Sequence, residues 1–105
     1  MIGFALLGCG RISRKHLDAI TTLQQKKGLC KLIGVCDIRA DRAEGVGRAY
    51  GVPYYTDFRA MMGDLGSQID VVNILTPSGY HAEHTIDVAR QGKHAVVEKP
   101  MALLS

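Results

Sequence analysis

Short apolar runs alternate with segments of helical periodicity along this chain, and no other feature constrains its fold as strongly. The run over residues 2–7 is continuous, as in a strand that is buried on both faces of a sheet, and residues 29–37 and 69–75 are further strand-like runs. Strands separated by helices of this length form βαβ units, which assemble into a parallel sheet with right-handed crossovers. We therefore expect the α/β class, with a doubly wound parallel sheet.

Local signals predict the remaining elements. Shorter strands are expected over 52–55, with Pro53 at its start or at a sheet edge, and over 94–98. Helices are expected from Ile12 to a stop at Gly28, over 40–50 before a C-cap at Gly51, from the cap residue Asp57 to about Leu65, and from Ser78 or Gly79 to Arg90. Helical spacing predicts that the first of these helices buries Ile12, His16, Ala19, Ile20 and Leu23, and the last Ala82, Ile86 and Ala89.

Length and composition narrow the class of protein. A chain of 105 residues with 47% apolar and 22% charged residues is typical of one globular domain. The net charge is only +3 and the basic residues are scattered, so we expect no nucleic-acid partner. No apolar run reaches the roughly 18 residues of a membrane span, and the start of the chain lacks a signal-peptide pattern. Cysteines without a C-x-x-C pair favour reduced thiols and a cytoplasmic protein.

A glycine-rich turn follows the first predicted strand. Gly8 permits a tight turn, and Gly10 has no side chain that would keep a pyrophosphate away from the backbone. Ser13 is small enough for the position where a third glycine often allows close packing of helix and strand. The free N–H groups at the start of the following helix favour phosphate. The pattern is that of a dinucleotide-binding turn, although a glycine pair also ends many strands that bind nothing.

Asp37 ends the second long run, at a somewhat greater distance from the turn than the usual 20 or so residues. A carboxylate there accepts hydrogen bonds from ribose hydroxyls and repels a 2′-phosphate. We therefore expect NAD as cofactor in preference to NADP, with the nearby Arg39 weakening that preference.

Ligands of open parallel sheets bind at the carboxyl ends of the strands, where Gly8, Asp37, Thr76–Pro77 and Glu98–Lys99 are expected to meet. Lys99 is the one ionisable donor of this set suited to hydrogen-bond a reacting hydroxyl. A solvated lysine before a proline turn is the alternative from position alone.

The segments GCGRISRKH, TPSGYHAEH and GKHAVVEKPMAL, with Asp37 between them, resemble the Gfo/Idh/MocA oxidoreductases over the whole chain. The resemblance implies a Rossmann fold and NAD as cofactor. It implies that Lys99 of the E-K-P motif is catalytic, assisting hydride transfer at a sugar or cyclitol hydroxyl, with a Lys99–Pro100 bond that is often cis in such proteins. The implied cofactor-binding residues are Gly8, Gly10, Arg11, Ile12, Asp37, Thr76, Pro77, His81, Glu98 and Lys99.

Within the family the chain looks most like the UDP-N-acetyl-glucosaminuronate 3-dehydrogenases of surface-polysaccharide synthesis, which oxidise a nucleotide sugar at C3. Another sugar or inositol dehydrogenase, a non-catalytic NAD-binding regulator and an unrelated Rossmann domain remain alternatives.

Members of the family add a helix and a strand to the nucleotide domain, then a second domain that carries the substrate pocket and the subunit interface. We therefore expect residues 1–105 to be a partial dinucleotide-binding domain of a protein that is a homo-oligomer when full length. The 105 residues alone should turn over no substrate and bind NAD weakly. An unfinished sheet should leave Val96 and Val97 uncovered and prone to self-association.

Other residues have simpler interpretations. His81 and His84 have a spacing that metal sites use, but no third ligand accompanies them, so no metal is expected. We interpret Tyr80 and His84 as surface or interface residues, and Arg14 as part of a solvated helix face. Cys9 is expected to serve the turn through its small size.

Overall fold

The computed structural model describes residues 2–10, 13–76 and 81–97, without the side chains of residues 81 and 82. Strands and helices alternate along these residues, as the sequence predicts. In chain order they are β1 (Ile2–Leu7), α1 (Ser13–Lys27), β2 (Cys30–Cys36), α2 (Ala40–Tyr50), β3 (Tyr54–Tyr55), α3 (Phe58–Leu65), the 3₁₀ turn η1 (Gly66–Gln68), β4 (Val71–Ile74), α4 (His81–Arg90) and β5 (His94–Val97).

The described strands form one sheet in the order β3-β2-β1-β4-β5, and every pair is parallel. The order runs outward from β1 in one direction through β2 and β3, and then in the other direction through β4 and β5. This reversal between β1 and β4 is the topological switch point of a doubly wound sheet. The fold class expected from the sequence is confirmed.

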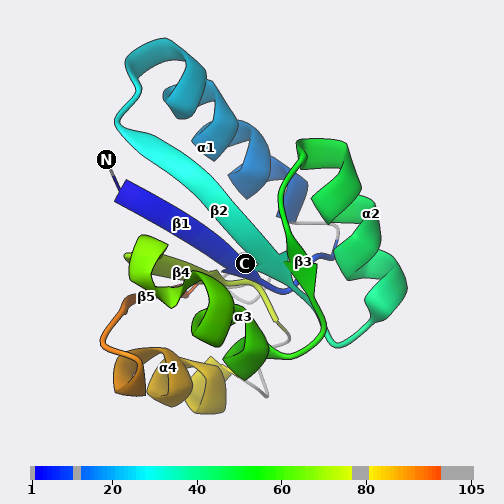
Figure 1. The fold of residues 1–105 in the computed structure, drawn as a ribbon, viewed down its shortest axis with the longest axis vertical. Coiled ribbons are helices and arrows are strands. Elements are labelled where there is room, and N and C mark those ends of the chain that lie inside the picture. Colours follow the sequence, from blue (N-terminus) through cyan, green and yellow to red (C-terminus); the bar gives the residue numbers. More distant parts are fainter. Residues whose placement is uncertain (1, 11–12, 77–80, 98–105) are drawn as a thin grey trace, which may run out of the picture.

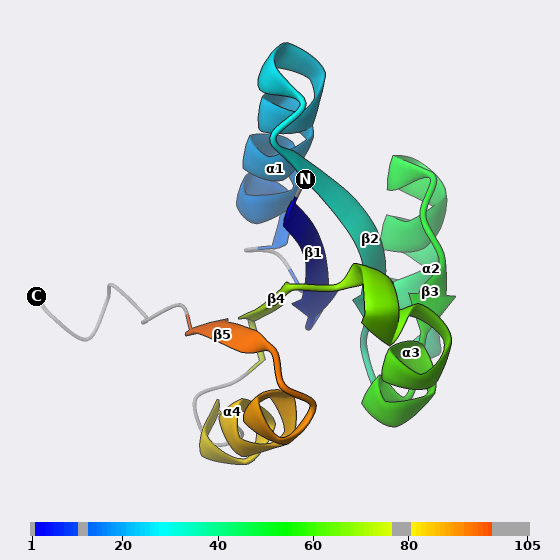
Figure 2. The same ribbon diagram turned by 60° about the vertical axis from the view of Figure 1, so that its left-hand side comes forward.

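Helices cover both faces of the sheet, and each face has its own apolar cluster (Figures 1 and 2). Successive residues of β1 point to opposite faces, so Leu6 packs in one cluster and Leu7 in the other. Helices α1 and α2 cover the cluster that contains Leu6, and α3 and α4 cover the cluster that contains Leu7. The helix side chains buried against the sheet include Leu17 and Ile20 on one face and Met61, Met62 and Val88 on the other.

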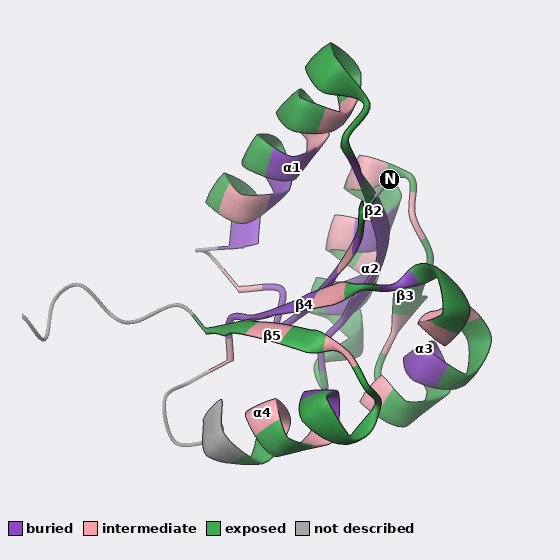
Figure 3. Cartoon of the chain, turned by 90° about the vertical axis from the view of Figure 1, so that its left-hand side faces the viewer, coloured by how far each residue is buried: buried purple, intermediate pink, exposed green. Residues whose placement is uncertain are grey.

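Burial decreases from the middle of the sheet toward β5 (Figure 3). The central strands β1, β2 and β4 are mostly buried, whereas β5 has no fully buried residue. Val96 is 45% exposed and Val97 36%. The expectation that these valines are uncovered is confirmed; self-association of this surface stays a prediction.

Two helix-capping residues, Asp57 and Gly51, have the roles that the sequence predicts. The Asp57 side chain accepts a hydrogen bond from the backbone N–H of Ala60 and so caps α3. Gly51 adopts the left-handed conformation at the end of α2, with φ of 67°. The end of α2 agrees with the prediction because Gly51 stops the helix, whereas Arg39 at its start makes no side-chain capping hydrogen bond.

The buried faces of two helices differ from the prediction. In α1, Ala19 and Leu23 are exposed, and Leu17 and Ile20 are the apolar residues that pack on the sheet. In α4, Ile86 and Ala89 are exposed and Val88 is buried. Neighbouring apolar residues on a short helix define several overlapping stripes, and contact with the sheet decides between them.

Strand β1 has the predicted bounds, whereas β2 and β4 are shorter than the runs over 29–37 and 69–75 that predict them. Strand β4 begins at Val71 because Ile69 ends the 3₁₀ turn and the Asp70 carboxylate accepts a hydrogen bond from the N–H of Gly3. The expected starts of helices at Ile12 and at Ser78 or Gly79 lie outside the described residues. Of the described helices, none is long and apolar enough to cross a membrane.

Candidate dinucleotide site at the switch point

The first turn of the site leaves β1 at Gly8, beside the end of β4. Gly8 has a φ of 109°, a conformation that glycine adopts without strain, and its N–H donates to the carbonyl of Cys36. A Cβ at Gly8 would lie 2.9 Å from the carbonyl carbon of Leu75 and 3.0 Å from the nitrogen of Thr76. Only glycine therefore fits where the two strand ends approach each other.

Gly10 has a different environment. In the part of the chain that the structure describes, the nearest atom to a Cβ there would be a guanidinium nitrogen of Arg42, 3.9 Å away. The Gly10 carbonyl accepts a hydrogen bond from the Ser13 hydroxyl, at 2.6 Å, and one from the Ser13 N–H. Ser13 is only 2% exposed and begins α1, so this serine joins the turn to the helix. Gly10 thus presents bare backbone to open space at the start of a helix, which is the arrangement that admits a phosphate.

Asp37 connects the end of β2 to the glycine turn. One carboxylate oxygen accepts a hydrogen bond from the N–H of Cys9 at 2.7 Å, and the other accepts from the N–H of Arg39 at 2.8 Å. The side chain is only 8% exposed. The sequence predicts a ribose-binding acid at this place. It does not predict the hydrogen bond from Cys9 to Asp37, because these two residues are far apart in the chain.

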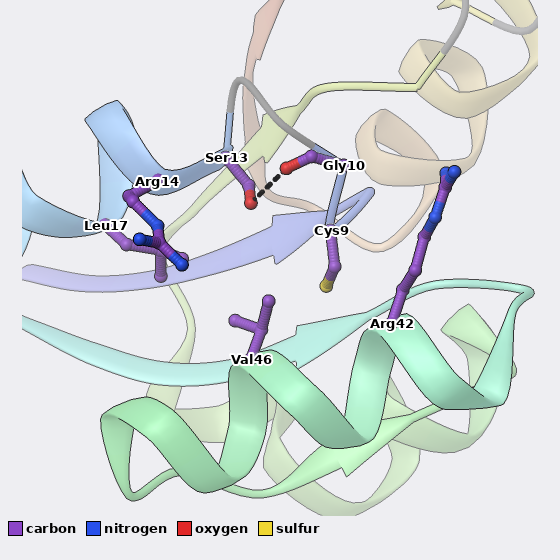
Figure 4. A pocket seen from close by; sticks show the side chains of 7 residues that line it. All are labelled: Cys9, Gly10, Ser13, Arg14, Leu17, Arg42 and Val46. Carbon is purple, nitrogen blue, oxygen red and sulfur yellow. Dashed lines mark hydrogen bonds between the residues drawn. The ribbon is translucent and has the colours of Figure 1, made fainter.

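A cavity of about 370 Å³ adjoins the turn, between α1 and α2 (Figure 4). Leu17 and Val46 provide apolar surface, and the arginines Arg14 and Arg42 extend along it from opposite sides. Sequence reasoning misses both arginines: it interprets Arg14 as solvated and passes over Arg42. The one sequence feature that could have placed Arg42 at this cavity is its spacing from Val46, because residues four apart share a face of the predicted helix.

The thiol of Cys9 also borders this cavity. Burial, aided by the negative charge of Asp37, raises its pKa to about 12. The thiol is therefore neutral at physiological pH and unsuited to nucleophilic chemistry. This agrees with the expectation that Cys9 serves the turn through its size.

Thr76 follows the end of β4 and makes a contact that the sequence does not predict. Its Oγ1 lies 2.7 Å from Nδ1 of His84, on the second turn of α4. His84 is partly buried and contacts Thr76, whereas the sequence indicates only a surface or interface residue.

Gly8, Gly10, Asp37 and Thr76 are the predicted site residues that the structure describes fully, and all lie at the carboxyl edge of the sheet. His81 is the first residue of α4, and its side chain is not described. The other predicted site residues, together with the Lys99–Pro100 bond, lie outside the described residues: Arg11, Ile12, Pro77, Glu98 and Lys99.

Comparison with known proteins identifies relatives over nearly the whole chain. The model of the GFO_IDH_MocA family, described as an oxidoreductase family with an NAD-binding Rossmann fold, matches residues 2–105. A D-apiose dehydrogenase from Paraburkholderia graminis is 33% identical over 94% of this chain and 25% of its own length. The NAD(+)-dependent scyllo-inositol 2-dehydrogenase from Bacillus subtilis is 36% identical over 94% of this chain and 28% of its own length.

Solved structures give the same result. The WlbA dehydrogenase from Bordetella pertussis, crystallised with NADH and UDP-GlcNAcA, has a TM-score of 0.84 and 34% identity, over 95% of this chain and 30% of its own. The WlbA enzyme from Chromobacterium violaceum, with the same two ligands, has a TM-score of 0.82 and 34% identity, over 95% of this chain and 28% of its own. The chain thus spans between a quarter and a third of the length of these relatives.

Proposed function

The chain belongs to the Gfo/Idh/MocA oxidoreductases, with their NAD-binding Rossmann fold, and from this premise we propose that it forms the cofactor-binding part of a sugar dehydrogenase. Residues at the carboxyl edge of the sheet would hold NAD, and the glycine turn would accommodate its pyrophosphate. The substrate-binding groups, and the catalytic groups that act with Lys99, would come from residues beyond these 105. The share of each relative's length that the chain covers supports this division.

The observation that carries the proposal is the contrast between the two glycines of the turn. Gly8 is required by its conformation and by the neighbouring backbone of β4. Among the described residues Gly10 meets neither demand, since a Cβ there would lie no closer than 3.9 Å to any atom of them. A ligand that approaches the backbone explains a glycine that the fold itself does not need.

Each predicted site residue has a proposed role. The N–H groups at the start of α1, with Arg14 and Arg42 at the adjoining cavity, balance the negative charge of the pyrophosphate. Asp37 keeps acceptor capacity for the adenosine ribose hydroxyls while it holds the turn. Gly8, Gly10, Arg11, Ile12, Thr76, Pro77, His81, Glu98 and Lys99 complete the proposed cofactor site.

Lys99 is the proposed catalytic residue, by its match to the E-K-P motif. When bound, NAD accepts a hydride from the carbon of a secondary alcohol. The Lys99 ammonium hydrogen-bonds the hydroxyl of that alcohol and stabilises negative charge on its oxygen as the proton leaves toward a base. The alcohol becomes a ketone, with two electrons transferred as hydride.

We further propose a nucleotide sugar, of the UDP-N-acetyl-glucosaminuronate kind oxidised at C3, as the substrate, and the cytoplasm as the place of reaction. Support comes from the two WlbA structures, which contain UDP-GlcNAcA. The other relatives are named for apiose, glucosides and inositols, so another sugar or an inositol is the alternative substrate.

Titration of the chain with NADH, followed through its backbone amide NMR signals, tests the proposal. We expect saturable shifts centred on the glycine turn, and Gly10→Ala should abolish them without lowering the free energy of unfolding. Gly45→Ala is the matched control, because a Cβ at Gly45 also meets nothing within 4 Å but lies away from the turn, in α2.

The same variant tests activity in the complete protein. Gly10→Ala should abolish NAD reduction with UDP-N-acetyl-glucosaminuronate, and Gly45→Ala should leave it unchanged. NADH binding that Gly10→Ala does not alter would contradict the proposed site. Binding without reduction of NAD by any sugar or inositol would contradict the dehydrogenase and leave the site standing.

A further inference from the structure

The contact between Thr76 and His84 joins the switch point to the helix that follows it. Thr76 stands just beyond β4, and its backbone nitrogen would be 3.0 Å from a Cβ at Gly8. It therefore abuts the glycine turn of the proposed cofactor site. His84 lies eight residues later, on the side of α4 that faces back toward the end of β4 through this contact.

A threonine hydroxyl rotates about its Cβ–Oγ bond and has one donor and two acceptor positions. A partner fixed at 2.7 Å from Oγ1 takes one of these positions and so determines where the others point. The ring of His84 is suited to this task because it is carried by a helix packed on the sheet through Val88.

We infer that His84 is a positioning residue of the cofactor site, which acts by fixing the Thr76 hydroxyl for NAD. The inference rests on the proposed function, since it assigns Thr76 to the cofactor. His84 itself touches neither cofactor nor substrate in this scheme. Its contribution to NAD affinity passes entirely through the hydroxyl of Thr76.

Substitutions of matched shape separate this role from a purely structural one. His84→Leu places a methyl group where Nδ1 was, whereas His84→Asn keeps a hydrogen-bonding atom at the same number of bonds from the backbone. Thr76→Val likewise removes the hydroxyl and keeps the shape, and Thr76→Ser keeps the hydroxyl. His94→Leu is the control, since His94 is an exposed histidine at the amino end of β5.

The experiment is an NADH titration of the wild type, the single variants and the Thr76→Val/His84→Leu double variant. Each of Thr76→Val and His84→Leu should raise the Kd about fivefold, the effect of one neutral hydrogen bond. His84→Asn and Thr76→Ser should restore most of the affinity, and His94→Leu should leave it unchanged. The double variant should bind no more weakly than Thr76→Val alone, because His84 has nothing to act on once the hydroxyl is gone.

The inference would be overturned if the fold increases in Kd of the two single variants multiplied in the double variant. It would also be overturned if the His84→Leu protein bound NADH with wild-type affinity. In both cases NADH still binds the wild type, and the proposed function stands. A wild type that does not bind NADH would overturn the proposed function and this inference together. The melting temperature of each variant, measured alongside, identifies any loss of affinity that follows from unfolding.

Discussion

Asp37 combines two tasks in one side chain. Its carboxylate accepts hydrogen bonds from the backbone N–H groups of Cys9 and Arg39 and so stabilises the glycine turn. The same carboxylate is the proposed acceptor for the ribose hydroxyls. A neutral acceptor would serve the first task, whereas the exclusion of a 2′-phosphate requires the negative charge. The two tasks are therefore separable by experiment.

Asp37→Ser removes the charge and most of the reach of the side chain. We expect the Kd for NADH to rise about tenfold, while NADPH gains relative to NADH because the Asp37 carboxylate no longer repels a 2′-phosphate. The free energy of unfolding should fall by about 1–3 kcal/mol, because two backbone N–H groups lose their acceptor.

Titrations with NADH and NADPH and urea unfolding measure these effects. Asp41→Ser is the control, since Asp41 pairs with Arg39 at 3.6 Å but is largely exposed. An unchanged ratio of the two affinities would show that Asp37 does not select the cofactor.

The sequence predicts the bounds of a helix best where a capping residue marks one of its ends. Helix α2 agrees with its prediction because of Gly51, and α3 because of Asp57. The buried stripe of α1 is predicted correctly at Ile20 but not at Leu17 and Leu23, and that of α4 is predicted wrongly at Ile86 and Val88, because the contact of each helix with the sheet decides which apolar residues are buried. The contact of Thr76 with His84 is unpredictable for the same reason: it depends on where α4 is placed.

The two glycines of α2 show how packing overrides helix propensity. A Cβ at Gly45 meets nothing within 4 Å, whereas one at Gly47 would lie 2.6 Å from a ring carbon of Tyr54 and 2.8 Å from its Cβ. Gly45→Ala should therefore stabilise the chain by about 1 kcal/mol through helix propensity. Gly47→Ala gains the same propensity but forces β3 away from α2, at a cost of about 1–3 kcal/mol.

Urea unfolding of the two variants compares these energies within one helix. Gly47→Ala should be the less stable by about 1–3 kcal/mol. Equal stabilities would mean that β3 moves away from α2 without cost, and that Tyr54 contributes little to the edge of the sheet.

Across the whole molecule, the two apolar clusters are linked by the sheet between them, and each contains a buried thiol whose pKa is raised to about 12. Cys9 belongs to the cluster under α1 and α2, and Cys36 to the cluster under α3 and α4. Burial raises the pKa of each thiol to about 12, with Asp37 adding to the effect at Cys9 and Asp57 and Asp37 at Cys36. Both thiols are protonated in the folded chain over the range where exposed cysteines ionise.

These raised pKa values make the stability of the fold sensitive to alkaline pH. In the unfolded chain the two thiols ionise near their ordinary pKa of about 8.5, so above this pH the unfolded state binds fewer protons than the folded state. The contribution to stability is thus fully present below about pH 8.5 and is lost as the pH rises toward 12. We expect the free energy of unfolding to decrease over this range. The slope should correspond to a difference of up to two bound protons between the folded and unfolded states, one for each thiol.

Urea unfolding between about pH 7.5 and 10.5 measures this slope. Other groups titrate in the same range, so the thiol contribution is the difference between the wild type and the Cys9→Ala/Cys36→Ala variant. The alanines keep the backbone N–H that binds Asp37 and remove both titrating groups. Each single variant should remove part of the difference, but the two parts should not simply add, because the Cys9 thiol donates to the Cys36 carbonyl at 3.7 Å and the charge of Cys36 adds to the raised pKa of Cys9. If the double variant retained the full slope, the thiols would not be held neutral by burial, and Cys9 would be available as a reactive group beside the cofactor.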